Sequence, residues 1–270
     1  MTTASIAQRY LAGRDCHPDY KKCMLNLAGK LTDLSASAIN AHLRMRQESV
    51  SAITVANERR QALTLWRWAW EEGLTDHAPR GVMKVKAPLR PVRAWTIADC
   101  RALVKGAEAF FGKRMRNGVD TGKFLQCWVL LAYETGARYG DIFSWKKDNF
   151  VLSSVGWVTS KTGVPCTRQL SGRALALVAE MLAASPDGRV LGWVCCRRQS
   201  FKLMRHLISA AGLPAGSGRW LRRSAATHLE MNQPGKAQWF LAHKTAGLAA
   251  RHYLDQSQLA SDGLRPPSIY

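Results

Sequence analysis

A basic stretch with three prolines divides the 270-residue chain into two unequal parts. It reads HAPRGVMKVKAPLRPVRA and spans residues 77–94. Each proline lacks an amide hydrogen and restrains the residue before it, so the stretch predicts extended, exposed backbone. The chain length suits one large domain or two smaller ones, and this stretch favours two. We expect a domain at 1–77, a linker at 78–95 and a larger domain at 96–270.

The first part predicts helices joined by short turns. Apolar residues recur at three- and four-residue steps in SIAQRYLAGR and DYKKCMLNLAGKL, and serines can cap SASAINAHLRMRQ. The longest periodic segment is TVANERRQALTLWRWAWEEGL, on which Trp66 and Trp70 lie one helical turn apart. Such a tryptophan stripe is more often core than a platform for nucleic-acid bases, and we interpret it as core.

The second part changes its hydrophobic period once. TIADCRALVKGAEAFF and KFLQCWVLLAYETGA predict helices, the first behind an approximate capping box of Thr96 and Asp99. NFVLSSVGWVTSKTGVPCTRQL then predicts three short strands with tight turns, and helical segments follow it. The expected fold class is therefore mainly α with a small antiparallel β-sheet.

The net charge is uneven along the chain. It is +20 overall, yet residues 1–77 carry 10 Lys and Arg against 8 Asp and Glu, so nearly all the excess lies beyond them. A fold does not need this imbalance, and its commonest reason is a polyanionic partner, either nucleic acid or an anionic membrane. The membrane is disfavoured, because no apolar run reaches transmembrane length and the first residues lack the apolar core of a signal peptide.

Cysteine usage indicates a reducing compartment. The seven cysteines are an odd number without repeated CxxC spacing. This argues against a disulfide framework and a zinc module and suits free thiols in a cytoplasmic protein. The sequence also offers no convincing carboxylate cluster for a metal ion, so we expect none.

Two polar clusters flank the predicted strands. In ETGARYGDIFSW, Arg138 follows the end of an apolar helix, and Asp141 is spaced to share its helical face and hold the guanidinium. Taken alone, this is a surface ion pair. In TSKTG, Lys161 would lie at the tip of a β-hairpin, where a lysine is usually only solvated. It would donate a proton only with a phosphate within reach.

Two further clusters lie near the end of the chain. In GRWLRRSAATHL, Arg219 and Arg222 are spaced for one helical face and Arg223 adds charge. The planar guanidinium suits phosphate, because it donates two hydrogen bonds at once. LAHKTAGLAARHYLD holds His243 and Tyr253. A tyrosine in such a stretch is, by itself, a structural residue with a satisfied hydroxyl.

The order of these residues resembles the catalytic set of the tyrosine recombinases, the phage-integrase family. ETGARYGDI is similar to that family's TGxRxxE/D box, and LRRSAATHL, LAHK and HYLD are similar to its HxLRHxxAT, LGH and tyrosine boxes. A helical core-binding domain, a basic linker and a catalytic domain with a small sheet would match the simpler Cre- or Xer-like arrangement. The resemblance covers nearly the whole chain.

The resemblance implies an enzyme that cleaves and rejoins DNA through a covalent 3′-phosphotyrosine, without ATP, metal or cofactor, for integration or excision of a mobile element. Tyr253 would be the nucleophile, Lys161 the general acid for the departing 5′-oxygen, and Asp141 the group that orients Arg138. The phosphate would be held by Arg138, Arg222, His243 and Arg219. The implied partners are a double-stranded recombination site and further copies of the chain in a synaptic tetramer.

The family pattern is not complete. Arg219 stands where His or Lys is usual, and because arginine stays protonated it can donate hydrogen bonds but cannot act as a base. Ala242 replaces the glycine of the LGH box, and the gap from His243 to Tyr253 is about one residue longer than usual. Outside the catalytic set, the cations expected on DNA are Arg80, Lys84, Lys86, Arg90, Arg93, Arg223 and Lys244.

Three other functions stay open at this point. A type IB topoisomerase shares the attack chemistry but would relax supercoiled plasmid as a monomer, and the separate helical domain argues against it. A DNA-binding protein with a decayed site is favoured by Arg219 and predicts salt-sensitive binding without a covalent adduct. A basic membrane-surface protein would bind liposomes and ignore duplex DNA.

Overall fold

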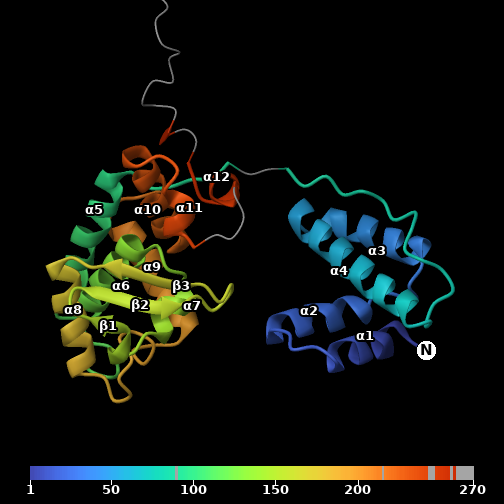
Figure 1. Ribbon diagram of the computed structural model, residues 1–270, viewed down its shortest axis with the longest axis horizontal. Coiled ribbons are helices and arrows are strands. Elements are labelled where there is room, and N and C mark those ends of the chain that lie inside the picture. The colour runs from blue at the N-terminus through green and yellow to red at the C-terminus, as the bar shows by residue number, and fades with distance from the viewer. Residues whose placement is uncertain (89–90, 215, 243–246, 256–257, 260–270) are drawn as a thin grey trace, which may run out of the picture. The chain divides into compact units, whose positions relative to one another are not determined.

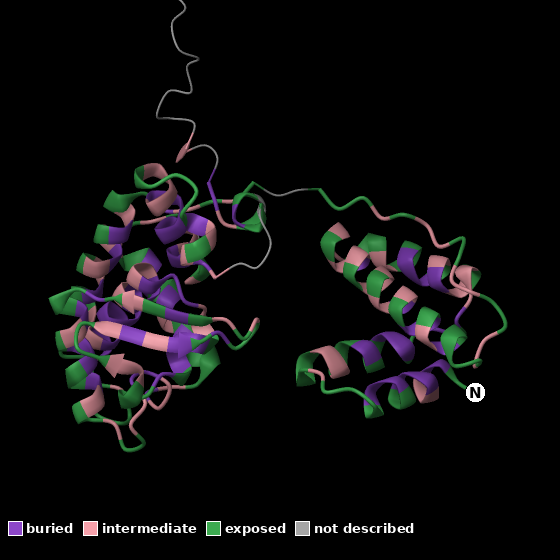
Figure 2. Ribbon diagram, in the orientation of Figure 1, coloured by how far each residue is buried: buried purple, intermediate pink, exposed green. Residues whose placement is uncertain are grey.

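The computed structural model describes residues 1–88, 91–214, 216–242, 247–255 and 258–259. The chain divides into two compact units, Met1–Arg90 and Pro91–Tyr270, each with its own buried residues on the inward faces of its helices (Figures 1 and 2). Three residues singled out from the sequence, Arg90, His243 and Lys244, lie outside the described residues.

The first unit is a bundle of helices. Its helices are α1 (Thr3–Ala12), α2 (Pro18–Ala28), α3 (Ala36–Ser49) and α4 (Ala52–Glu71). Side-chain oxygens of Thr2, Ser35 and Ser51 accept the amide hydrogens that the first turns of α1, α3 and α4 leave unpaired. These caps fix where the helices begin, and apolar residues from each helix then meet in one core.

The tryptophan stripe of α4 is only partly core. Trp66 is buried and donates its indole hydrogen to the His77 carbonyl at 2.9 Å, as the core interpretation requires. Trp70 is 45% exposed, so the same interpretation was wrong for that residue. The buried face of α4 runs through Leu65, Trp66 and Ala69, and a residue four positions beyond Trp66 is rotated about 40° towards the edge of that face.

Part of the proline-containing stretch packs on the first unit. Val82 and Met83 lie against its core, and Arg59 on α4 donates to the Met83 carbonyl at 2.6 Å. Asn40 on α3 also brackets this segment, accepting from the Met83 amide and donating to the Gly81 carbonyl. The described residues of the stretch, 77–88 and 91–94, have no regular secondary structure, as expected, and its first half is anchored to the helices. Its role as a linker stays a prediction.

The second unit is mainly helical with one small sheet, which confirms the expected fold class. Its helices are α5 (Ile97–Gly106), α6 (Thr121–Thr135), α7 (Tyr139–Ser144), α8 (Gly172–Ala183), α9 (Arg197–Ala210), α10 (Arg219–Asn232), α11 (Ala237–Phe240) and α12 (Leu248–His252). Short 3-10 turns cover Ala107–Phe110 and Lys147–Asn149. The strands are β1 (Phe150–Val151), β2 (Ser154–Val158) and β3 (Pro165–Gln169), antiparallel in the order β1-β2-β3. The register pairs Ser154 with Gln169 and Val158 with Pro165.

Helix α6 forms the centre of this unit. It is buried along most of its length and contacts α5, α8, α10 and β3 (Figure 1). It ends at Gly136, which has a φ of 60°, a left-handed conformation that costs a residue with a side chain about 1–2 kcal/mol. A Cβ atom at this position would also overlap the Phe240 ring of α11. Glycine thus lets the chain turn from α6 into Arg138 directly beneath α11.

Candidate active site

Arg138 and Asp141 form the ion pair that their spacing predicts. Arg138 caps α7, and its Nη1 lies 4.0 Å from Oδ2 of Asp141, a carboxylate that is almost fully buried. The separation is within ion-pair range but beyond hydrogen-bond range. Among the described residues, neither of these two atoms has a hydrogen-bond partner. Asp141 therefore keeps the Arg138 guanidinium close without a direct hydrogen bond between these two atoms, and Nη1 can still donate to another group.

Asp141 also binds the hairpin that carries Lys161. Its Oδ1 accepts hydrogen bonds from Ser160 N at 3.0 Å and Ser160 Oγ at 2.6 Å. Lys161 follows Ser160 in the turn between β2 and β3, and it is exposed. The predicted hairpin is thus confirmed, and one carboxylate joins the turn to Arg138. Ser160 was not foreseen from the sequence.

Arg222 is the buried cation of the site. It lies on α10, and its guanidinium donates to the Gly136 carbonyl and, at 2.9 Å, to the Leu241 carbonyl. It therefore connects α10, the end of α6 and the end of α11. The pKa of Arg222 is lowered to about 10: burial is the largest cause and the Arg138 charge adds to it, whereas Tyr253 and Asp141 act to raise the pKa. Its Nε has no hydrogen-bond partner among the described residues.

Tyr253 lies beside this cation. The Arg222 guanidinium carbon is 5.1 Å from the centre of the Tyr253 ring, a distance typical of a cation–π contact. Thr227, on the same helix as Arg222, holds the backbone there: its hydroxyl accepts from Asp255 N at 3.0 Å and donates to the Tyr253 carbonyl at 3.5 Å. Helix α10 thus supplies both the cation and the anchor of the tyrosine. His252, the neighbour of Tyr253, is exposed.

The other two arginines of α10 differ in exposure. Arg219 is exposed at the first turn, and Arg223 is half-buried. Burial and the Arg219 charge lower the pKa of Arg223, whereas Tyr253 raises it. The structure gives Arg219 no role that explains its place in the sequence pattern.

Arg168 is a site-building residue that the sequence did not reveal. It lies on β3 and donates to the carbonyls of Trp239 at 3.1 Å and Phe240 at 2.5 Å, with its guanidinium 5.1 Å from the Phe240 ring centre. Together with Arg222 it binds the carbonyls at the end of α11, where the supply of intrahelical amides runs out. The next residue, Ala242, has a φ of 51°, where glycine is favoured. Two arginines thus hold the carbonyls directly before Ala242, whose conformation is strained.

The linker cations are exposed where the structure describes them, namely Arg80, Lys84, Lys86 and Arg93. The segment ends against the second unit: Ala94 N donates to Asp255 Oδ2 at 2.9 Å, and Trp95 is buried. Among the described residues, no three His, Cys, Asp or Glu side chains gather as a metal site would require. No helix in that same part of the chain is long and apolar enough to cross a bilayer.

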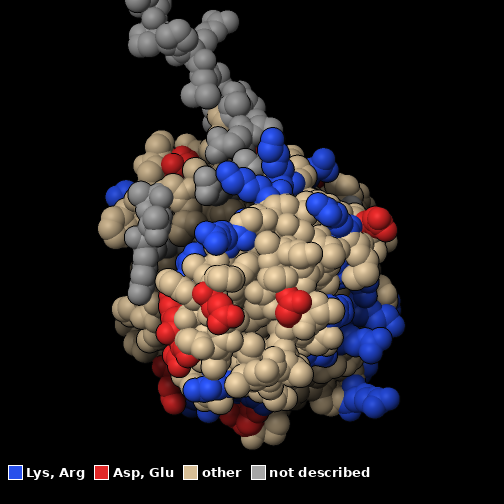
Figure 3. Space-filling model, turned by 90° about the vertical axis from the view of Figure 1, so that its right-hand side faces the viewer, with Lys and Arg blue, Asp and Glu red and all other residues tan. Residues whose placement is uncertain are grey.

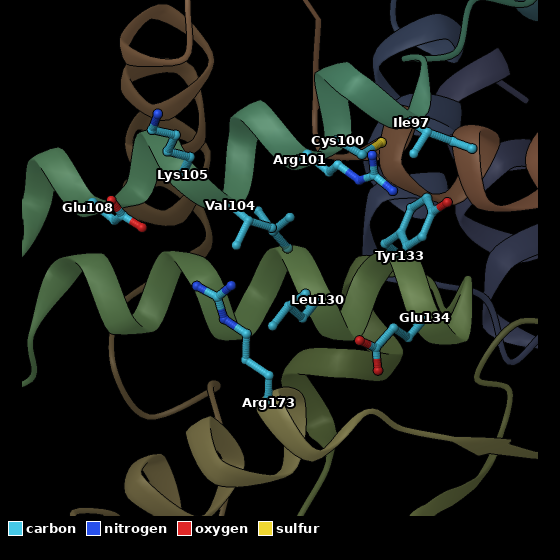
Figure 4. Close-up of a pocket in the computed structure, with 11 residues that line it drawn as sticks. Ile97, Cys100, Arg101, Val104, Lys105, Glu108, Leu130, Tyr133, Glu134 and Arg173 are labelled. Atoms are coloured by element: carbon cyan, nitrogen blue, oxygen red, sulfur yellow. The ribbon is translucent and has the colours of Figure 1, made fainter.

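A separate cavity of about 580 Å³ lies between α5, α6 and α8 (Figure 4). Val104 and Leu130 form part of its apolar lining, with Arg101, Glu134 and Arg173 around them. Glu134 is already bound by the amide and hydroxyl of Ser171. The cavity contains none of the arginines that surround Tyr253.

Comparison with known proteins places the fold. No protein-family model and no curated protein sequence matches the chain. Among solved structures, it is similar to a lambda integrase dimer bound to a COC′ core site, with a TM-score of 0.73 and 19% identity over 100% of this chain and 80% of that one. It is also similar to the Tn1549 transposon integrase in complex with circular intermediate DNA (TM-score 0.71, 12% identity, 98% and 100% covered). A third match is the XerH site-specific recombinase bound to a palindromic difH substrate (TM-score 0.71, 12% identity, 96% and 93% covered).

These similarities define the class of the fold. The chain has the fold of the tyrosine recombinases, as its sequence motifs indicated.

Proposed function

We propose that this protein is a site-specific DNA recombinase that cleaves and rejoins DNA through a covalent bond between Tyr253 and a 3′-phosphate. The fold, and the DNA-bound integrases and recombinases that share it, support this class of activity. The observation that carries the proposal is the contact between the buried Arg222 and Tyr253.

This contact favours a nucleophile beside an anion-binding site. Arg222 is 5% exposed, and the nearby Arg138 charge lowers its pKa, so the two cations are held together at an electrostatic cost. A phosphate between them would remove that cost, and its transition state, with more charge on the non-bridging oxygens, would gain more. Strongly perturbed groups of this kind cluster at functional sites.

The chemistry follows from the groups present. The Tyr253 oxygen would bond to phosphorus as the bond from phosphorus to the 5′-oxygen breaks, and Lys161 would give its proton to that departing oxygen. The phenolic proton would pass to a base, for which His243 is the sequence candidate. Arg138 and Arg222 would hold the non-bridging oxygens. A second 5′-hydroxyl could reverse the step without ATP, because the phosphotyrosine keeps the bond energy.

The partner would be a double-stranded recombination site, bound by four copies of the chain in the cytoplasm. Solved relatives in fold include lambda integrase as a tetramer bound to a Holliday junction. The excess positive charge beyond residue 77 suits a DNA backbone. Figure 3 shows one face of the molecule, on which lysines and arginines gather towards the top and right of the view. The biological role we infer is integration or excision of a mobile element.

The test is trapping of the covalent intermediate. We would incubate the protein with a pool of nicked duplexes of random sequence, isolate SDS-resistant adducts and sequence the attached DNA. Wild-type protein should give an adduct at a preferred site and Tyr253→Phe none. An undiminished adduct in Tyr253→Phe would refute the assignment. Tight DNA binding without any adduct would instead favour a decayed homologue, and efficient plasmid relaxation by monomers a topoisomerase.

A further inference from the structure

We propose that Ser160 is a positioning residue, whose hydroxyl sets the place of the Lys161 general acid by binding Asp141. This inference rests on the proposed recombinase function and adds a residue to it. The sequence analysis assigns no role to Ser160, which lies in the β2–β3 turn, 19 residues beyond Asp141.

The Asp141 carboxylate lies between Ser160 and Arg138. Asp141 is 2% exposed, and its two oxygens divide their roles. Oδ1 accepts the short bond from Ser160 Oγ at 2.6 Å and a second from Ser160 N at 3.0 Å. Oδ2 faces Arg138. A hydroxyl bound to a carboxylate at this length is a strong, charge-assisted hydrogen bond.

The turn itself is internally fixed, so it moves as a unit. The Thr159 and Thr162 hydroxyls bond each other at 2.7 Å, and Thr159 Oγ1 also accepts from Val164 N at 3.0 Å. Gly163 closes the turn with a φ of 63°. The bonds from Ser160 therefore decide how this stiff turn, with exposed Lys161 at its tip, sits against the Arg138 side of the site.

Loss of the Ser160 hydroxyl should loosen the turn without releasing it. In Ser160→Ala, the amide bond to Asp141 remains and the stronger bond disappears. General acids are sensitive to such displacement, because they must be within about 3 Å of the oxygen they protonate. We expect Ser160→Ala to form the covalent adduct about 10-fold more slowly, whereas Ser160→Thr should keep most of the rate.

A sulfur-substituted substrate distinguishes a misplaced general acid from a general loss of active-site structure. The site recovered by adduct sequencing would be remade with sulfur in place of the bridging 5′-oxygen, because a departing thiolate needs no proton. On this duplex, Ser160→Ala should cleave at the wild-type rate, as should Lys161→Ala. On the oxygen duplex, the double variant Ser160→Ala/Lys161→Ala should be no slower than Lys161→Ala alone, because both changes remove the same step.

The controls keep the outcomes distinct. Ser153→Ala, in the exposed β1–β2 turn, removes a hydroxyl near the same sheet and should cleave both duplexes normally. Ser160→Gly is a second variant that lacks the Ser160 hydroxyl and should behave like Ser160→Ala. Three results would each overturn the role of Ser160 while leaving the recombinase proposal intact. They are slow cleavage of the sulfur duplex by Ser160→Ala, cleavage of the oxygen duplex by Ser160→Ala at the wild-type rate, and a double variant slower than Lys161→Ala alone. A wild-type protein that forms no adduct with Tyr253 would overturn both.

Discussion

The two units of this protein differ in how completely their partly buried charged side chains are paired. In the helical unit, Glu58 receives bonds from three donor atoms: Arg46 Nε at 3.1 Å, Arg46 Nη2 at 2.8 Å and His42 Nε2 at 3.0 Å. Burial raises the pKa of Glu58, but the bonds from Arg46 and His42 outweigh it and leave the pKa below its ordinary value. The Glu58 carboxylate is therefore fully paired, while His42 Nδ1 has no hydrogen-bond partner among the described residues.

In the second unit, the buried cluster is incomplete. Arg138 and Asp141 face each other beyond hydrogen-bond distance, and Arg222 has its pKa lowered by burial and by a neighbouring cation. The comparison teaches that complete pairing indicates a structural role, while cations held close together indicate a site that an anion completes. Four predictions test it, from the largest effect to the smallest.

Removal of Arg222 should have the largest effect on activity. Arg222→Gln should slow adduct formation by roughly 100- to 1,000-fold, because one donor to the developing charge on phosphate is lost. Quenched single-turnover assays on the recovered site would measure it. Arg223→Gln is the matched control on the same helix and should slow the step much less. A cleavage rate within threefold of wild type in Arg222→Gln would remove Arg222 from the proposed site.

Removal of the Glu58 charge should affect stability instead. Glu58→Gln should lower the unfolding midpoint of the helical unit by roughly 5 °C at neutral pH, with adduct formation per folded molecule unchanged. The sign of its pH dependence follows from the lowered pKa. The charge stabilises the fold above the ordinary carboxyl pKa of 4.5, and this contribution is lost as the pH falls through the lower folded value. The difference in midpoint between wild type and variant should therefore shrink below about pH 4.5, and a constant difference would contradict the assignment.

An inorganic anion should partly complete the second cluster. In a buffer of low ionic strength, about 10 mM sulfate should raise the unfolding midpoint of wild type by roughly 2–4 °C relative to chloride of equal ionic strength. Glu58→Gln should keep this increase, since its cluster needs no anion, and Arg222→Gln should lose most of it. Differential scanning fluorimetry would measure the midpoints. Equal increases with sulfate in both variants would mean that the two clusters do not differ as described.

The smallest expected effect concerns Ala242, beside the carbonyls that Arg168 and Arg222 hold. Ala242→Gly should increase the free energy of unfolding by about 1 kcal/mol, because glycine adopts the positive φ without strain. Leu152→Gly is the matched control, since Leu152 has a φ of 52° in a turn outside the site. Both should be more resistant to urea, and a loss of stability in Ala242→Gly would show that the strain lies elsewhere.

The fold was largely predictable from local patterns. The apolar run of α6 and the alternating pattern of β2 and β3 predict their secondary structure directly, because helix and strand periods depend on residues close together in the chain. The pairing of Arg138 with Asp141 was predictable for the same reason, since a helical turn brings positions three apart together.

The contacts that complete the site were not predictable in this way. Ser160 and Asp141 meet across 19 residues, and Arg168 reaches the Phe240 carbonyl across 72. Neither residue is distinguishable in the sequence from an ordinary surface serine or strand arginine. The prediction that Trp70 is buried failed for a different reason: the width of the buried face of a helix depends on what packs against it.

The fit of Gly136 beneath Phe240 has a consequence for inheritance and for engineering. The two residues lie more than a hundred positions apart, yet a side chain at one would occupy the volume of the other's ring. A segment that brings a residue with a side chain to position 136 is therefore incompatible with Phe240 in this chain. A chimera that brings in a bulkier residue at 136 needs a smaller ring partner at 240 in the same step, so the pair should be transferred together.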